Sequence, residues 1–278
     1  MFKSFTPFKH TGLVLSDAQR TGFTPCAPSQ AQSIGSVPHS NGALVVAGVE
    51  LFTIERKMVP TDMVKREAAK ACDKIEAETG RRPKGKHLKE VKEGIEHELL
   101  AKAFPKRKTV PVLWLDSYVL VGSTTAADVD SLVTILVSGQ QGLKIEPLRT
   151  AASVDESMSR WACEPGSADT PFIVGREVTV ATAGAGRASF KDMSVEDPEV
   201  VQALREPNLV TSLALCNRDE TSFVLTEALQ VKSLKVGASA GNDHADAAAA
   251  ECHLYRGELS RLMGELVEAL GGEARDAA

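Results

Sequence analysis

The sequence predicts an α+β protein, because strands and helices follow one another without the regular alternation of a βαβ fold. Three observations predict this class. Two apolar stripes at helical spacing occupy residues 60–104, strand-like apolar runs dominate residues 172–236, and an amphipathic helix ends the chain. With 278 residues, of which 43% are apolar and 25% charged, the chain can bury a substantial core in one to three structural units.

The first half of the chain is predicted to insert two helices between strands. Residues 1–59 are interpreted as strands and loops, with a turn at Asn41-Gly42. A helix should begin at Pro60, with Thr61 or Asp62 as its cap, and end at Gly80. A second apolar stripe runs from Leu88 to Phe104. The sequence therefore predicts an antiparallel helical hairpin whose connecting loop is residues 81–86.

The remaining elements are predicted in order along the chain. Strands at 110–115 and 118–121 precede a helix capped by Ser123 or Thr124, and a strand follows at 143–148. A short helix at 153–162 leads into an antiparallel sheet, with strands at 172–181, 187–193, 209–216, 222–225 and 229–236 and a helix within 194–205. Residues 237–250 have the composition of a flexible linker, and the closing helix carries one apolar face from Cys252 to Leu270.

Positive charge is concentrated in one segment. Residues 56–108 hold sixteen of the 32 Lys and Arg residues but only nine of the 37 Asp and Glu residues, which gives the segment a formal charge of +7 in a chain of −5. The connecting loop of the hairpin and its root, residues 106–108, carry no acid at all. This polarity favours binding to a polyanion, although a solvated helical surface is the simpler interpretation of any one of these side chains.

Compartment can be predicted from what the sequence lacks. No apolar run reaches the roughly 20 residues of a membrane span, and the first residues do not form a secretory signal. Five scattered cysteines without a C-x-x-C pair indicate reduced thiols. We therefore expect a cytosolic protein.

Catalytic motifs are incomplete wherever they begin. His97-Glu98 starts an H-E-x-x-H zinc motif, but position 101 is alanine. Gly184 and Gly186 lack the third glycine of a dinucleotide-binding loop, and no nucleotide-binding G-x-x-x-x-G-K-[ST] occurs. The six histidines show no metal-ligand spacing. We expect no enzyme activity, no cofactor and no metal.

Several short stretches, taken together and in order, resemble the recombination-associated protein RdgC family of bacteria. The stretches are Phe23-Thr24-Pro25-Cys26, Ile34-Gly35, Val37-Pro38, Met58-Val59-Pro60, 95–100, Lys102-Ala103-Phe104, 145–148, 209–215, 222–225, 232–235, Gly257-Glu258-Leu259 and 268–274. They cover essentially the whole chain. Ser36 stands where the family has an aromatic residue, and Pro105-Lys106-Arg107-Lys108 replaces its usual Ser- and Arg-rich connection.

The resemblance implies a sequence-nonspecific double-stranded DNA-binding protein of the nucleoid, which forms a ring-shaped homodimer around DNA and restrains RecA-driven strand exchange. It implies a central part at 1–59 and 109–150, a projecting helical tip at 60–108, and a base at 151–278 with the C-terminal helix. The family positions place dimer contacts at Phe104 in the tip and at Phe190, Lys191 and Asp192 in the base.

Encircling DNA requires cations that face phosphates rather than a motif that reads bases. The first candidates are the cations of the hairpin loop and of the root of the hairpin, where the chain leaves its second helix, namely Arg81, Arg82, Lys84, Lys86, Lys106, Arg107 and Lys108. The second candidates lie in segments that resemble the family, namely Lys65, Arg66, Lys89, Lys191, Lys232 and Lys235. Aromatic residues are not interleaved with the basic run, so a platform for stacking single-stranded bases is not indicated.

Two other functions remain open from the sequence. One is a nuclease, or a nuclease accessory, that acts on recombination intermediates. The other is a protein that acts mainly by contacting RecA.

Overall fold

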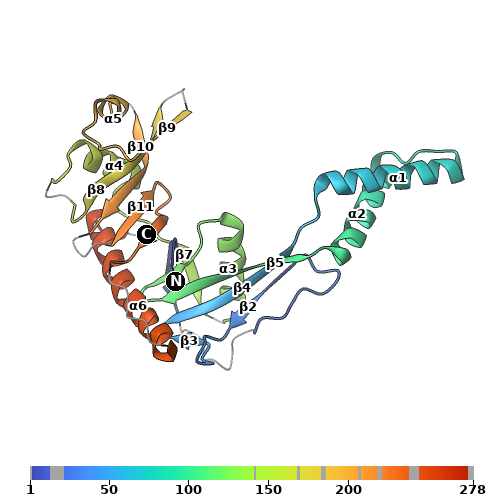
Figure 1. Cartoon of the computed structure of the whole chain (residues 1–278), viewed down its shortest axis with the longest axis horizontal. Coiled ribbons are helices and arrows are strands. Elements are labelled where there is room, and N and C mark those ends of the chain that lie inside the picture. The colour runs from blue at the N-terminus through green and yellow to red at the C-terminus, as the bar shows by residue number, and fades with distance from the viewer. Residues whose placement is uncertain are drawn as a thin grey trace. The chain divides into compact units, whose positions relative to one another are not determined.

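The computed structural model describes residues 2–12, 22–140, 142–167, 170–182, 186–205, 208–217, 221–237 and 244–274. The chain forms two compact units. Unit 1 comprises Met1–Arg20, Pro38–Leu51 and Val110–Ala278, and unit 2 comprises Thr21–Val37 and Phe52–Thr109. Helices and antiparallel strands are mixed along the chain, which confirms the predicted α+β class (Figure 1).

The first sheet has seven strands among the described residues, in the order β2-β4-β5-β6-β1-β7 with β3 paired to β4. The strands are β1 (Thr6–Thr11), β2 (Gln32–Val37), β3 (Val45–Val46), β4 (Val49–Lys57), β5 (Pro105–Trp114), β6 (Tyr118–Val121) and β7 (Lys144–Pro147). β1 is antiparallel to both of its neighbours, so that Phe8 lies opposite Val119 on β6 and Pro147 on β7.

The second sheet lies wholly in unit 1, and its five described strands run in the order β12-β11-β10-β8-β9. The strands are β8 (Ile173–Thr182), β9 (Gly186–Lys191), β10 (Leu209–Cys216), β11 (Ser222–Thr226) and β12 (Val231–Lys235). All four pairings are antiparallel, as predicted. Leu213 and Leu215 are buried while Ser212 and Ala214 are half-exposed, which is the alternation that one covered face requires.

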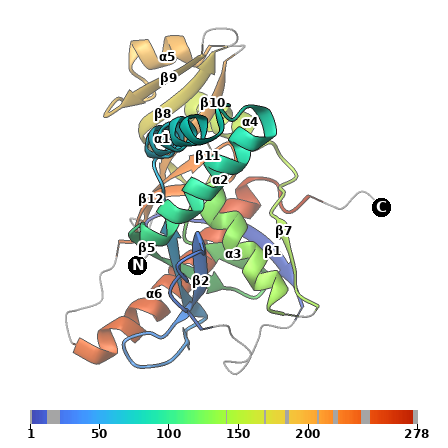
Figure 2. The ribbon, with the colours of Figure 1, turned by 90° about the vertical axis from the view of Figure 1, so that its right-hand side faces the viewer.

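The core of unit 1 forms where helices cover the buried face of the second sheet. Helix α4 (Val154–Cys163) packs on β10, and Trp161 and Phe223 belong to the same hydrophobic cluster. Helix α6 (His244–Ala269) adds a fully buried stripe that includes Cys252, Leu259 and Leu266. Helix α3 (Ala126–Ser138) lies beside β7 (Figure 2), and α5 (Pro198–Ala203) follows β9.

Unit 2 contains the two predicted helices. Helix α1 (Thr61–Thr79) ends at Gly80, whose φ of 70° is left-handed and whose N–H donates to the Glu76 carbonyl at 2.8 Å. Helix α2 (Gly85–Lys102) packs against α1. Glycine at the end of α1 acts as the sequence predicted, because it adopts a positive φ without the strain a Cβ would cause.

Three local predictions are wrong. Neither Thr61 nor Asp62 caps α1, because Pro60 occupies the N-cap position and no side chain bonds there. Similarly, Thr125 rather than Ser123 or Thr124 precedes α3. Gly85 and Lys86 were assigned to the loop but form the first turn of α2.

The predicted linker is also partly wrong. Residues 244–250 belong to α6. Alanine has the highest helix propensity of any residue type, so the alanine run extends the amphipathic helix toward its N-terminus.

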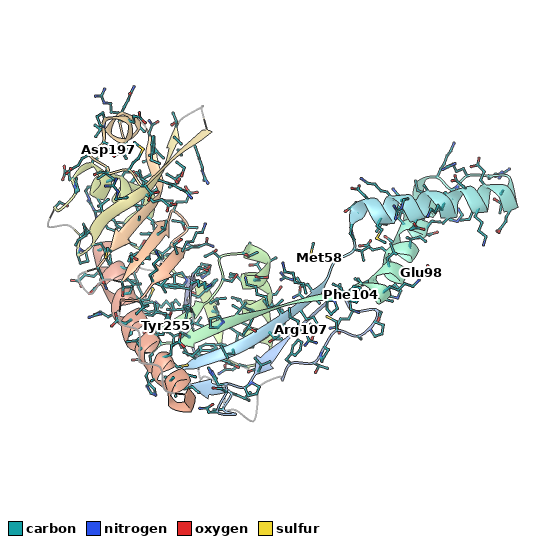
Figure 3. All side chains as sticks on the ribbon, in the orientation of Figure 1. Met58, Glu98, Phe104, Arg107, Asp197 and Tyr255 are labelled. Carbon is teal, nitrogen blue, oxygen red and sulfur yellow. The ribbon has the colours of Figure 1, made fainter. Side chains whose placement is uncertain are left out.

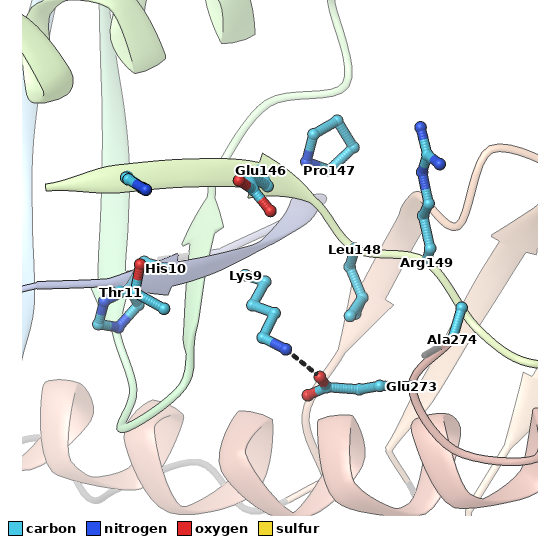
Figure 4. Close-up of a pocket in the computed structure, with 10 residues that line it drawn as sticks. Lys9, His10, Thr11, Glu146, Pro147, Leu148, Arg149, Glu273 and Ala274 are labelled. Carbon is cyan, nitrogen blue, oxygen red and sulfur yellow. Dashed lines mark hydrogen bonds and ion pairs between the residues drawn. The ribbon is translucent and has the colours of Figure 1, made fainter. Parts of the chain in front are cut away.

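The C-terminal segment of unit 1 is held in place by its backbone and by Glu273. The Ala151 N–H donates to Gly272 at 2.9 Å, and the Ala274 N–H donates to Arg149 at 2.9 Å. The Glu273 carboxylate accepts from Lys9 Nζ at 2.6 Å and from the Tyr118 hydroxyl at 2.7 Å. Figure 4 shows the ion pair at one side of a pocket of about 660 Å³.

We expect Glu273→Gln to lower the free energy of unfolding at pH 7 by about 1 kcal/mol. The hydrogen bond from Lys9, and then that from Tyr118, holds the pKa of Glu273 below its usual value. A carboxylate of this kind stabilises the fold above its unfolded pKa of about 4.3, and the stabilisation is lost as the pH falls through the lowered folded pKa. Urea unfolding of both proteins at pH 7 and at about pH 3.5 should show the difference shrinking.

Tyr118 provides an independent check of the same contact. Burial of the ring, and then Glu273, raises the pKa of Tyr118 to about 12. In a Tyr255→Phe background, Tyr118 is the one remaining tyrosine, since the chain has two. Its phenolate absorbance after a pH jump should titrate at a lower pKa in Glu273→Gln, and an unchanged titration would contradict the contact.

Candidate nucleic-acid interface

All thirteen cations predicted to contact DNA are exposed. Ten of them belong to unit 2, on α1, α2, their connection and the start of β5, whereas Lys191, Lys232 and Lys235 belong to unit 1. Exposure makes each of them available to a phosphate. Their ion-pair partners distinguish them from one another.

Four cations on α1 and α2 have an acid beside them on the same helix. The pairs are Lys65 with Asp62 at 3.5 Å, Arg66 with Glu67 at 3.6 Å, Lys86 with Glu90 at 3.9 Å and Lys89 with Glu93 at 3.5 Å. Exposed pairs of this kind contribute little to stability, but each acid cancels the local field of its cation. These four positions fit the interpretation of a solvated, mixed-sign helical surface. The spacing of Lys86–Glu90 and Lys89–Glu93 was visible in the sequence.

The two arginines of the connection between the helices differ in their surroundings. Arg82 Nη1 bonds Asp73 at 2.8 Å and Glu76 at 3.1 Å, and the charge of Asp73 is the main reason that the pKa of Arg82 is raised. Arg82 therefore ties the connection to α1. The side chains of Arg81 and Lys84 have no ion pair with any described residue. Both are exposed, so they present their full charge to solvent.

The three cations at the start of β5 do not act alike. Arg107 Nε donates to the Glu55 carboxylate, and its guanidinium lies 5.5 Å from the centre of the Phe23 ring. Lys106 has no ion pair within the described part of the chain. Lys108 is exposed on the same strand. Sequence reasoning missed Glu55, whose partner lies 52 positions away along the chain.

Phe104 is exposed to 93%, so it is not a residue of the core. Met58, which precedes α1 as Phe104 follows α2, is exposed to 76%, and its exposure was not predicted from the sequence. Figure 3 shows both where the helices meet the strands of unit 2. Helix α2 has no buried residue, and its apolar stripe is only partly covered.

The stretch predicted as a base contact lies at the end of β9. Phe190 packs partly against the core of unit 1, and Lys191 pairs with Glu177 at 3.8 Å. Asp192 has a φ of 57°, and its carbonyl accepts from Arg176 Nε at 3.1 Å. On the opposite edge of the sheet, Lys232 and Lys235 are exposed and have no ion pair with a described residue.

Comparison with known proteins decides the family. A model of the family described as "Putative exonuclease, RdgC" matches residues 3–273, nearly the whole chain. The chain belongs to the RdgC family.

Curated relatives named "Recombination-associated protein RdgC" support this membership. The protein of Dechloromonas aromatica (strain RCB) is 31% identical over 280 residues, which cover 93% of this chain and 91% of the relative. That of Janthinobacterium sp. (strain Marseille) is 30% identical over 276 residues, with the same two shares. That of Tolumonas auensis is 28% identical over 294 residues, which cover 98% of this chain and 97% of the relative. The resemblance found in the sequence is confirmed.

The family description and the names of the relatives differ. The family description names an exonuclease, whereas the relatives are named for an association with recombination. Among the described residues, no group of three or more His, Cys, Asp or Glu side chains could hold a metal ion. His97 and Glu98, which began a zinc motif in the sequence, are exposed on α2. Within the same residues, no helix is long and apolar enough to cross a membrane.

Proposed function

We propose that this RdgC-family chain binds double-stranded DNA without sequence preference, encircles it as a homodimer and restrains RecA-driven recombination. The observation that carries the proposal is the +7 charge of residues 56–108, whose side chains at Arg81, Lys84 and Lys106 are exposed and have no described ion-pair partner. When cations of this kind neutralise phosphates, counterions condensed on the DNA are released, and this release gives the protein affinity for DNA of any sequence. Such a protein works in the cytosol, at the nucleoid.

The exposed apolar side chains support the homodimer. Phe104 and Met58 are large apolar side chains that lie exposed beside a helix pair with little burial of its own, and exposed apolar side chains of this kind are typical of a surface that another protein covers. A second copy of the chain is the partner proposed here, with the tip contact at Phe104 and the base contact at Phe190, Lys191 and Asp192. The central, tip and base parts at 1–59 and 109–150, 60–108, and 151–278 are part of the same proposal.

Binding to duplexes of unrelated sequence, followed by mobility shift at several salt concentrations, tests the proposal. We expect similar affinities for all duplexes and a steep linear fall of log K with log salt. Binding that depends on sequence, or that is indifferent to salt, would contradict it. Sedimentation should give the mass of a dimer without duplex and that of a dimer plus one duplex with it, because a monomer cannot close a ring.

A second candidate function is a nuclease, which the description of the matching family names. Incubation of the pure protein with labelled linear DNA and magnesium or manganese decides between the two. Loss of label that follows the protein through purification would establish the nuclease. Intact DNA under conditions of full binding would leave the DNA-binding proposal.

A further inference from the structure

Strand β12 carries two lysines, Lys232 and Lys235, whose spacing of three residues would place them on opposite faces of a regular strand. A β-bulge changes this. Lys232 lies opposite Val224 of β11 and Lys235 lies opposite Ser222, so three steps along β12 correspond to two steps along β11. Because Ser222 and Val224 are two residues apart, they point to the same face of the sheet. The two lysines therefore share that face as well.

The backbone of β12 shows where the extra residue lies and what holds it. Ser233 has a φ of 52°, in the left-handed region that residues with a Cβ rarely adopt. Such a conformation persists only where the surrounding structure imposes it. On the side of β12 away from β11, the Val231 N–H donates to the Phe5 carbonyl at 2.9 Å. The Leu234 N–H donates to the Lys3 carbonyl, also at 2.9 Å. The bulge is therefore bonded on both sides, and the positions of the two lysines are fixed with it.

A groove of about 360 Å³ lies on the same face of the sheet, and Lys232 and Val224 line it. Phe223 and Leu225, which alternate with Val224 along β11, are buried in the core of unit 1, so the groove is on the face turned away from that core. Hydroxyl groups also line the groove, namely those of Thr179, Thr211, Ser212, Thr226 and Ser233. Lysine and hydroxyl side chains are among the groups that contact phosphate and sugar in protein–DNA complexes.

Two acids line the groove as well, but each is paired with a cation of strand β9. Glu177 lies 3.8 Å from Lys191, and Glu227 lies 2.6 Å from Arg187. The two lysines of β12 are exposed and have no ion pair with a described residue. Like charges held on one face without a paired acid raise the local potential, which favours a polyanion.

We propose that the face of β11 and β12 that carries Lys232 and Lys235 is a contact surface for the phosphate backbone of duplex DNA, and that the bulge at Ser233 places both lysines on it. Positions opposite residues two apart on an antiparallel strand lie roughly 6.8 Å apart. One strand of B-DNA carries a phosphate for about every 3.4 Å of helix axis, so each lysine can meet a different phosphate. This inference rests on the proposed DNA-binding function and assigns it a site in unit 1.

Salt-dependent binding to duplex DNA tests the assignment. For each phosphate no longer neutralised, we expect Lys232→Ala and Lys235→Ala to weaken binding roughly fivefold near physiological salt and to lower the slope of log K against log salt by about 0.9. The effects should add in the double variant, and Tm should not change because both side chains are exposed. Replacing both lysines with arginine keeps the charge and should keep the slope. An unchanged slope in the double alanine variant would overturn the assignment.

Lys144→Ala combined with Arg149→Ala is the matched control. These two cations are also exposed, belong to unit 1 and have no ion pair with a described residue. They lie on the first sheet at β7 and just after it, and Glu146 is on the same face of β7 as Lys144. We expect this variant to weaken binding by less than about threefold. Equal losses in the two double variants would overturn the assignment, because the net charge of unit 1 rather than the placement of its lysines would then set the affinity.

The unsubstituted protein separates failure of this site from failure of the proposed function. If it binds duplex DNA with a steep salt dependence while the double alanine variant keeps the same slope, only the site in unit 1 is refuted. If it binds no duplex at all, the proposed function fails, and the assignment of a phosphate contact to β12 fails with it.

Discussion

Replacing Trp161 with alanine is expected to lower the free energy of unfolding by about 3–5 kcal/mol. Trp161 is fully buried on α4, and its ring lies 6.4 Å from that of Phe172, which in turn meets Phe223 edge-on at 5.4 Å. Truncation would remove an aromatic side chain from the centre of the core and leave a cavity that the neighbouring rings cannot fill. Urea unfolding followed by circular dichroism measures the decrease.

Trp161→Phe is the matched control. Phenylalanine keeps most of the apolar contact, and the indole N–H that it removes has no hydrogen-bond partner within the described chain. No buried acceptor is therefore left unsatisfied, and we expect a decrease below about 1.5 kcal/mol. Equal decreases in the two variants would show that the edge-on aromatic contacts do not stabilise the core as inferred.

The sequence predicted best where a local signal sets an element's ends. Pro60 and Gly80 lie on either side of α1. Pro60 has no N–H to donate within a helix, so it stands at the start of α1, and Gly80 adopts the left-handed conformation that ends the helix. The strand predicted at 209–216 is β10 with the same bounds, and its buried and half-exposed residues alternate from Thr211 to Cys216. Both signals act over a few residues, so they do not depend on the rest of the fold.

Prediction was weaker where two local preferences compete. The alanine run before Cys252 has the composition of a linker, yet 244–250 extend α6 because the following apolar stripe is fully buried and the helix is already nucleated. Thr61 was expected to cap α1, but Pro60 takes the N-cap position and leaves Thr61 inside the helix.

The candidate site shows the same limit on a longer scale. Charge counting found the basic segment, and i,i+4 spacing could have identified the paired lysines of α2. Nothing local predicts that Arg107 belongs to Glu55, because the pair forms only when β4 and β5 lie side by side and residues 22–30 cover it. A run of adjacent cations in a sequence therefore overstates how many can face one ligand.

Replacing Arg81, Lys84 and Lys106 together with alanine is expected to weaken duplex binding about a hundredfold near physiological salt. A slope of about 0.9 per neutralised phosphate corresponds to roughly fivefold in affinity for each at that salt, and the three factors multiply. These side chains are exposed and have no ion pair with a described residue, so no neighbouring acid offsets their attraction for phosphate. Fluorescence anisotropy with a labelled duplex across several salt concentrations measures the affinity and the slope.

A second triple variant, Lys65→Ala, Lys86→Ala and Lys89→Ala, removes the same formal charge from helices α1 and α2 of the same unit. Each of these lysines pairs with an acid three or four residues away, at 3.5 Å, 3.9 Å and 3.5 Å. If an ion pair with a neighbouring acid prevents a cation from binding the phosphate backbone of DNA, this variant should weaken binding by less than about tenfold. It should also keep most of the slope of log K against log salt. Equal effects in the two triple variants would mean that total charge, rather than the placement of cations without an acidic neighbour, sets the affinity.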